Sequence, residues 1–259
     1  MVRWSPRSTA GTRPLWITAA AGTAFATLAF AVAHHVTGLS RPDVALSLAA
    51  HRFADSHPAW LTAMAAATRA GDAAIVMPVA AVAVGLLAWK RLRHSAVVIA
   101  ASLILIPLIR LGLSVAFHRP RPQDPLSAAH GWAFPSGHTT TAAVAALVAA
   151  YAVWPYTRRA WQRGAVVAGA AAWAITVAIS RVALVVHWPS DVIGGLLLAT
   201  ALVALITWFT AAFGPPRGGP HTEQARRERD DRSSPTLQER ASRSRNTVDP
   251  CQPTTSEKT

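Results

Sequence analysis

The sequence predicts an all-α membrane protein in which six transmembrane helices form a bundle. Of its 259 residues, 52% are hydrophobic and 14% are charged, which is a low charged fraction for a water-soluble domain. Residues 1–213 contain no glutamate and five aspartates, whereas a water-soluble surface needs charges of both signs. Apolar runs of about 20 residues, the length that crosses a bilayer, alternate with short arginine clusters. Most of this part of the chain is therefore expected to lie in lipid.

The formal net charge of +13 at pH 7 does not indicate a nucleic-acid-binding protein. The arginines form short clusters between apolar runs and do not follow one polar face. The single cysteine, Cys251, excludes an intramolecular disulfide and a cysteine-rich metal site. Membrane topology explains the basic residues better than a nucleic-acid partner does.

The first span is predicted over residues 14–36, after a short basic segment at residues 1–13. A signal peptide is the alternative interpretation. Its apolar region would be shorter and would end at a small-residue cleavage site before a polar domain. Because this run ends in His34 and His35, we predict a retained helix.

Residues 37–72 are less hydrophobic and connect the first two spans. Apolar residues recur in this segment at the spacing of an amphipathic helix lying at the membrane interface. They are Trp60, Leu61, Met64 and Ala67. The second span is predicted over residues 73–89 and ends in the basic cluster 90–93.

The third span is predicted over residues 95–117 and contains Arg110. A charge in a transmembrane helix is costly and is therefore a functional candidate, but a long side chain near a helix end also reaches the interface. Both interpretations stay open. The polar segment 118–132 follows and begins with Arg119-Pro120-Arg121-Pro122.

The last three spans are predicted over residues 136–156, 164–186 and 189–213. Residues 214–259 have few apolar side chains and the composition of a disordered tail. The predicted domains are therefore an N-terminal segment (1–13), a transmembrane domain (14–213) and a disordered tail (214–259).

Six spans place both chain ends on one side of the membrane, and the positive-inside rule predicts that this side is cytoplasmic. The basic clusters on this face lie in residues 3–13, 90–93, 158–163 and 217–229. The opposite face receives the segment 118–132, the start of the fourth span and the segment 181–191. We expect a multi-pass plasma-membrane protein with its polar site on the extracytoplasmic face.

The segment between the fifth and sixth spans carries residues suited to phosphoryl transfer. Arg181 is followed by His187, and Asp191 lies four residues further on. A histidine can act as a nucleophile, an aspartate can hold its imidazole in one tautomer, and an arginine can neutralise an anion. Pro189 suits the first position of a helix, so Asp191 falls in a first turn, where anions are also attracted. A structural hydrogen bond is the alternative for an isolated His–Asp pair.

Two motifs resemble those of a known enzyme family. Pro135-Ser136-Gly137-His138 resembles the second signature motif of the type 2 phosphatidic acid phosphatase (PAP2) family, and Ser180-Arg181 with His187 and Asp191 resembles the third. Arg121-Pro122 resembles the end of the first motif. This family of integral membrane lipid phosphatases is related to the vanadium haloperoxidases, which are soluble. The resemblance implies a PAP2-like helical bundle.

The residues of these motifs are suited to binding phosphate. Arg121 and Arg181 can each donate two hydrogen bonds to phosphate oxygens. Ser136 can donate its hydroxyl, and the backbone amides of Gly137 and His138 add donors at a helix start. Because the arginines supply the positive charge, no metal ion and no other cofactor is expected.

Three side chains are candidates for catalysis. His187 would attack phosphorus to give a phosphohistidine, and Asp191 would stabilise the imidazolium. His138 would protonate the leaving oxygen and afterwards activate water.

The first motif departs from the family pattern at Ser114. The family has a lysine at this position, seven residues before the arginine of Arg121-Pro122. Arg110 lies one helical turn before Ser114, and Arg119 is nearby, so either is a candidate to replace the lysine as a phosphate contact.

The predicted function is hydrolysis of a phosphate monoester or diphosphate of a lipid. Candidates are a polyprenyl diphosphate, such as undecaprenyl diphosphate, and a phosphatidate. The alternative is a catalytically weak or inactive membrane protein that binds phospholipid or phosphate, with Ser114 as the sign of lost activity. A binding protein needs no activated nucleophile, so His187, Asp191 and His138 favour the enzyme. A transporter has less support, because the polar residues gather at one face and not at mid-membrane.

Overall fold

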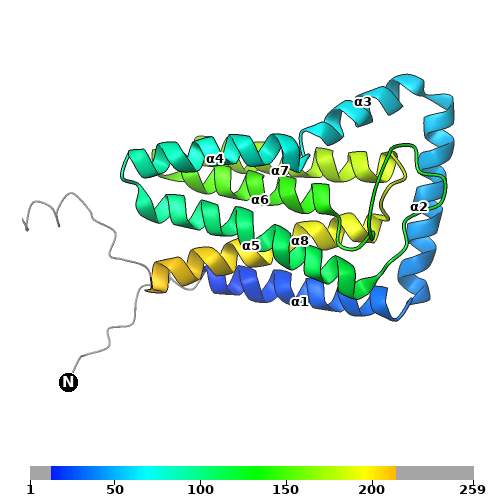
Figure 1. Cartoon of the computed structure of the whole chain (residues 1–259), viewed down its shortest axis with the longest axis horizontal. Helices are drawn as coiled ribbons and strands as arrows, with labels where there is room; N and C mark the ends of the chain where they lie inside the picture. Colours follow the sequence, from blue (N-terminus) through cyan, green and yellow to red (C-terminus); the bar gives the residue numbers. More distant parts are fainter. Residues whose placement is uncertain (1–12, 214–259) are drawn as a thin grey trace, which may run out of the picture. The chain divides into compact units, whose positions relative to one another are not determined.

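The computed structural model describes residues 13–213, which form α-helices, one short 3₁₀ helix and loops, with no strand among them (Figure 1). This confirms the predicted all-α class. Most of the predicted N-terminal segment and the whole predicted tail lie outside the described residues. In chain order the helices are α1 (Arg13–Ala33), α2 (Thr37–Ser56), α3 (Pro58–Arg69), α4 (Ala73–Trp89), α5 (Arg93–Phe117), α6 (Gly137–Val153), η2 (Trp154–Tyr156), α7 (Ala160–Ala183) and α8 (Pro189–Phe213).

Six helical segments in this part of the chain are long and apolar enough to cross a membrane. They are Pro14–Ala33, Pro58–Trp89, Arg93–Phe117, Gly137–Tyr156, Ala160–Ala183 and Pro189–Phe213. The prediction of a multi-pass membrane protein is thereby confirmed. The second span begins earlier than predicted, because α3 and α4 together form one apolar run.

The fifth span ends at Ala183 and does not continue to Val186 as predicted. Leu184, Val185 and Val186 are as apolar as a membrane helix, but they are at most 2% exposed and pack inside the protein. Hydropathy does not distinguish burial in protein from burial in lipid, which explains the wrong boundary.

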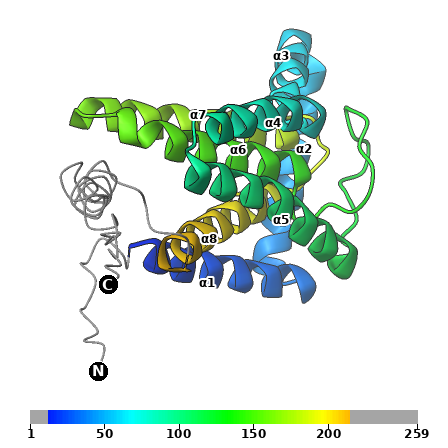
Figure 2. The same cartoon turned by 60° about the vertical axis from the view of Figure 1, so that its left-hand side comes forward.

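α6 lies at the centre of the bundle and packs against α5, α7 and α8 (Figures 1 and 2). Residues 139–146 of α6 are Thr, Ala and Val, and all are buried. Such small side chains allow helices to approach closely in a membrane. α1 packs along α8, and large apolar side chains on the outer face of α5 remain exposed, as expected for a surface in lipid.

α2 crosses one end of the bundle, where it contacts α7 and α8 (Figure 1). Its buried side chains include Asp43 and Ser47, one turn apart, although most of the helix is exposed. The loop 118–136 and the α7–α8 connection meet at the same end. Three irregular or polar segments therefore converge there.

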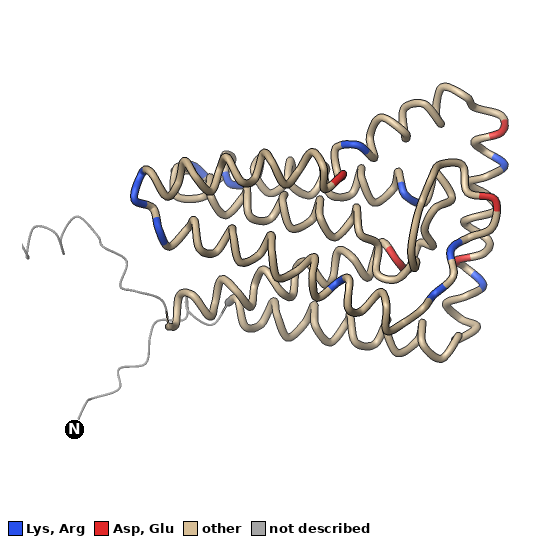
Figure 3. Tube along the Cα trace, in the orientation of Figure 1, with Lys and Arg blue, Asp and Glu red and all other residues tan. Residues whose placement is uncertain are grey.

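The opposite end of the bundle carries the α4–α5 and α6–α7 connections, and the charged residues that the structure describes there are basic (Figures 1 and 3). The residues concerned are Lys90, Arg91, Arg93, Arg158, Arg159 and Arg163. Both signs of charge occur at the end where α2 lies (Figure 3).

Candidate active site

The α7–α8 connection places Arg181, His187 and Asp191 together. Arg181 lies in the last turn of α7, and its carbonyl oxygen accepts hydrogen bonds from the backbone N–H groups of Val186 (3.2 Å) and His187 (3.3 Å). Pro189 begins α8, and Oδ2 of Asp191 accepts a hydrogen bond from the N–H of Trp188 at 2.9 Å. A carboxylate in the first turn that accepts from the N–H just before the helix stabilises that helix start. The connection therefore has a fixed backbone.

His187 is 1% exposed and Asp191 is fully buried. Nδ1 of His187 lies 3.4 Å from Oδ2 of Asp191, without the geometry of a hydrogen bond. Nε2 of the same ring lies 3.0 Å from Nη1 of Arg121. Because a guanidinium only donates, Nε2 is the acceptor and the ring proton is on Nδ1, toward Asp191.

Burial lowers the pKa of His187 from 6.5 to about 4, and Asp191 acts in the opposite direction. A buried imidazole loses hydration when it becomes charged, which is why the neutral form is favoured. At neutral pH Nε2 therefore carries no proton, and its lone pair accepts the hydrogen bond of Arg121.

Arg121 connects the loop 118–136 to His187. Its guanidinium donates hydrogen bonds to the carbonyl oxygens of Val186 (2.6 Å), His130 (2.8 Å) and Gly131 (2.9 Å). Burial lowers the pKa of Arg121, but an arginine remains protonated in proteins. A positive charge is thus fixed against the nucleophilic nitrogen.

Arg181 is 3% exposed, and its Nη1 donates to Oγ1 of Thr68 at 2.8 Å. Its Nε has no hydrogen-bond partner among the described residues. Electrostatic interactions connect Arg181, Arg121 and His187. A buried, incompletely paired guanidinium is costly unless an anion joins it, so this arrangement is suited to binding an anion.

The start of α6 completes the group. The N–H of Ser136 donates to the carbonyl oxygen of Asp191 at 3.0 Å, which ties α6 to α8. Oγ of Ser136 accepts a hydrogen bond from Thr139, so its own proton is available to another acceptor. Gly137 and His138 follow as the first residues of α6, where backbone N–H groups point out of the helix. Arg181, Arg121 and Arg110 are close enough to His138 to interact electrostatically with its side chain.

Arg110 reaches this helix start from α5. Its Nε donates to the carbonyl oxygen of Pro135 at 2.8 Å, and a Cβ at Gly137 would lie 3.1 Å from the guanidinium carbon. Gly137 therefore gives Arg110 room to approach. Ser114, at the position of the family lysine, is 3% exposed.

Arg119, which was a candidate phosphate contact, donates its hydrogen bonds to protein side chains. Its Nη1 donates to Asp191 (2.5 Å) and Ser190 (2.7 Å), and its Nη2 donates to Asp43 (2.7 Å). Both ends of the guanidinium are therefore occupied by protein groups. Asp43 was not among the predicted site residues, and its only sequence signal is that residues 1–213 contain so few acidic residues.

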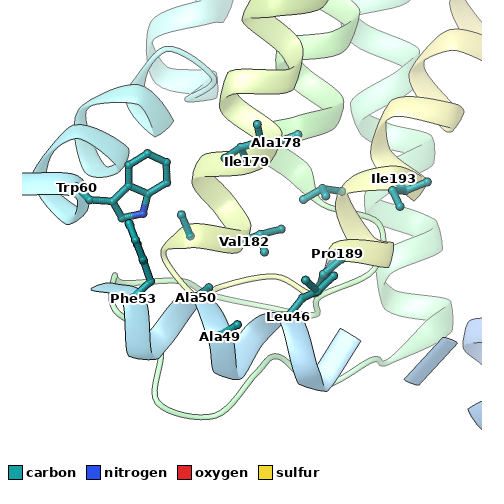
Figure 4. Close-up of a pocket in the computed structure, with 12 residues that line it drawn as sticks. Leu46, Ala49, Ala50, Phe53, Trp60, Ala178, Ile179, Val182, Pro189 and Ile193 are labelled. Atoms are coloured by element: carbon teal, nitrogen blue, oxygen red, sulfur yellow. The ribbon is translucent and has the colours of Figure 1, made fainter. Parts of the chain in front are cut away.

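An apolar pocket of about 440 Å³ lies beside the site (Figure 4). Residues from α2, α3, α7 and α8 line it, including Phe53, Trp60, Val182 and Pro189. Val182 follows Arg181 directly, and Pro189 is two residues from His187.

Among residues 13–213, no three His, Cys, Asp or Glu side chains are grouped as metal ligands.

Fold and site together define a multi-pass membrane protein with a buried histidine–aspartate pair beside a cluster of arginines. Residues 15–215 match the family model of the PAP2 superfamily, so the chain belongs to this superfamily. A crystal structure of a transmembrane PAP2 type phosphatidylglycerolphosphate phosphatase from Bacillus subtilis is similar, with a TM-score of 0.69 and 26% identity over 78% of this chain and 100% of that one.

Curated relatives match a shorter region. Phosphatidylglycerophosphatase B of Escherichia coli (strain K12) is 42% identical over 103 residues, 39% of either chain. The Haemophilus influenzae protein of the same name is 39% identical over 83 residues, 32% of this chain and 33% of that protein. The chain thus spans about two fifths or less of the length of the curated relatives it matches.

Proposed function

We propose that this protein is a metal-independent phosphatase that hydrolyses a phosphate monoester or diphosphate of a lipid through a phosphohistidine. One observation carries the proposal: the unprotonated Nε2 of buried His187 lies against Arg121, with Asp191 on the other side of the ring. The nucleophile His187, the carboxylate of Asp191 that orients it and the positive charge that binds an anion occur together. This is the arrangement that histidine attack on phosphorus requires.

In the first step the phosphate occupies the space between Arg121, Arg181 and the start of α6. The Nε2 lone pair of His187 forms a bond to phosphorus while the bond from phosphorus to the lipid oxygen breaks. The negative charge of the bound phosphate favours the protonated form of His138, which donates its proton to that oxygen. The Nδ1 proton stays on the ring, and the negative charge of Asp191 stabilises the imidazolium.

In the second step water hydrolyses the phosphohistidine. His138, now neutral, accepts a proton from the water as its oxygen bonds to phosphorus and the N–P bond breaks. Inorganic phosphate leaves, and His187 returns to its neutral form. The arginines stabilise the oxygen charge in both steps, and Arg110 takes the place of the lysine that Ser114 replaces.

The substrate is proposed to be an amphiphile. The polar site lies at one end of the spanning helices, and the apolar pocket beside Val182 and Pro189 can hold part of an acyl or isoprenoid chain. The names of the curated relatives make phosphatidylglycerophosphate a candidate. Phosphatidate and a polyprenyl diphosphate remain candidates of the same chemistry.

The site is proposed to face the extracytoplasmic side of the plasma membrane. The basic α4–α5 and α6–α7 connections lie at the other end of the bundle, and the positive-inside rule assigns that end to the cytoplasm. Both chain ends would then be cytoplasmic.

Phosphate release by the purified protein in detergent with EDTA tests the proposal. Phosphatidylglycerophosphate, phosphatidate and a polyprenyl diphosphate are compared, and His187→Ala should abolish release from all three. His34→Ala is the matched control, because His34 is exposed at the end of α1. Wild-type release in His187→Ala would reject the mechanism. Bound lipid without release by the wild-type protein would favour the binding protein instead.

A further inference from the structure

A buried ionic cluster beside the site includes two residues that the mechanism above does not use. Its members are Asp43, Arg119 and Asp191, and the two carboxylates are 2% and 0% exposed. They come from α2, from the loop 118–136 and from α8. Such a cluster is costly to bury unless its geometry and hydrogen bonds are nearly complete.

The ion pairs and hydrogen bonds of this cluster are nearly complete. Arg119 donates from Nη1 to Oδ1 of Asp191 at 2.5 Å and from Nη2 to Oδ2 of Asp43 at 2.7 Å. Asp43 also accepts from Ser190, through the backbone N–H (2.9 Å) and through Oγ (2.5 Å). Asp43 therefore holds both Arg119 and the residue next to Asp191.

The charges of this cluster matter for His187. Arg119 alone would neutralise Asp191, and a neutral pair would stabilise an imidazolium less than a carboxylate does. With Asp43 included, two carboxylates share one guanidinium and the cluster keeps a net charge of −1. The remaining Oδ2 of Asp191 is the oxygen that faces Nδ1 of His187.

We propose that Asp43 and Arg119 are positioning residues for His187. Arg119 fixes the Asp191 carboxylate, and Asp43 keeps the cluster negative, so that Asp191 can stabilise the imidazolium formed during phosphoryl transfer. This inference rests on the proposed function, since it assigns a role in the same reaction. It also explains why α2 packs on the end of the bundle although most of its residues are exposed.

A single and a double variant test the charge argument. Asp43→Asn makes the cluster neutral, so kcat for phosphate release should fall at least about tenfold while KM stays nearly constant. Asp43→Asn with Arg119→Gln restores a net charge of −1, so the double variant should be more active than Asp43→Asn alone. A purely structural role predicts the reverse, because the double variant loses more contacts.

Asp55→Asn is the matched control. It makes the same chemical change in the same helix, where Asp55 is exposed and pairs with His51. It should behave as wild type in kcat and KM. Equal kcat in Asp43→Asn and Asp55→Asn, or a double variant below Asp43→Asn, would overturn the proposal.

Two further measurements keep the test decisive. If Asp43→Asn does not fold in detergent, Arg119→Lys replaces it, because a lysine keeps the charge but lacks the two-ended fork that contacts both carboxylates. Wild-type kcat in Arg119→Lys would then refute the inference, and a loss of kcat at constant KM would support it.

Orthovanadate binding distinguishes this inference from the proposed function. Vanadate accepts a nitrogen ligand in the geometry of the transition state and needs no turnover. If the wild-type protein releases no phosphate from any lipid, the proposed function fails. Vanadate affinity that falls in Asp43→Asn and recovers in the double variant would still support the positioning role, and equal affinities in all variants would reject it.

Discussion

At the scale of single residues, the reactivity of His187 depends on keeping one ring nitrogen free of a proton. Arg121 donates toward Nε2, Asp191 faces Nδ1, and burial disfavours the charged ring. These three effects select one tautomer of the neutral imidazole. The same arginine supplies the charge that an incoming phosphate needs, so nucleophile and anion site are assembled from shared contacts.

The pH dependence of phosphate release should reflect this burial. The pKa of His187 is depressed from 6.5 to about 4, so the reactive neutral form persists above that pH and is lost as pH falls. We expect log kcat/KM to fall with a slope of about one below pH about 4. A separate limb near pH about 6 belongs to the substrate phosphate.

The Asp191→Asn variant shows which acidic limb of the pH profile reports the protonation of His187. Asp191 raises the pKa of His187, so its loss should move the acidic limb to lower pH and reduce the plateau. The substrate limb should not move. A wild-type limb at the ordinary histidine value that shifts in Asp191→Asn would contradict the assignment.

Arg110 provides a second test at this scale. It contacts the carbonyl oxygen of Pro135 beside the start of α6. If it replaces the missing lysine, Arg110→Ala should raise KM about 10- to 100-fold, the cost of one charge-assisted hydrogen bond. Ser114→Lys in that background should restore KM, as measured by steady-state phosphate release. Unchanged KM in Arg110→Ala would make Arg110 only an anchor for helix α5.

The motif residues of the site could be named from the sequence because they lie in short, ordered patterns. His187 and Asp191 are one helical turn apart, and the structure keeps them together. Asp43 could not be named, because its partner Ser190 is 147 residues away and only folding brings them together. Arg119 is predicted from the sequence only as a candidate phosphate contact. Its contacts with Asp43 and Asp191 could not be predicted, because both residues are more than 70 positions away.

At the scale of elements, hydropathy predicted the spanning helices well and α2 poorly. The spans α5 and α8 are long apolar runs whose ends were placed within two residues. α2 contains Pro42, two arginines and two aspartates, and no apolar run marks it. Its position on the bundle depends on the buried Asp43, a tertiary contact that periodicity does not reveal.

The packing of α8 against the segment before α6 makes a prediction for Gly194. A Cβ at this position would lie 2.5 Å from Cε2 of Phe134, whose ring is fully buried against Phe25 and Phe117. Gly194→Ala should reduce the free energy of unfolding by about 1–3 kcal/mol. It should also reduce phosphate release, because Phe134 lies two residues before Ser136.

Gly169→Ala is the control for this prediction. Gly169 lies in α7, where an added Cβ would meet nothing within 4 Å. The free energy of unfolding of Gly169→Ala should be unchanged or rise by up to about 1 kcal/mol, as for a helical glycine replaced by alanine. Both variants are compared by unfolding in detergent. Equal stability would show that α8 can move away from Phe134 at little cost.

At the scale of the whole described bundle, the arginines of the site and the basic clusters that indicate topology lie at opposite ends. The arginines that contact His187, Asp191 or Thr68 are held by specific hydrogen bonds, and those near α4–α5 and α6–α7 are largely exposed. Exposed clusters are the kind that the positive-inside rule counts. The basic residues of the described bundle therefore form two groups, one at the site and one at the opposite end.

This separation predicts which end a membrane-impermeant thiol reagent reaches. In a Cys251→Ser background, Ala128→Cys lies in the loop 118–136 at the site end, and Ala160→Cys lies at the start of α7 at the basic end; both positions are exposed. On intact cells we expect labelling of Ala128→Cys alone, because the reagent cannot cross the bilayer. After permeabilisation both variants should react, which verifies that each thiol is accessible. Labelling of Ala160→Cys alone on intact cells would invert the topology and place the lipid phosphate on the cytoplasmic side.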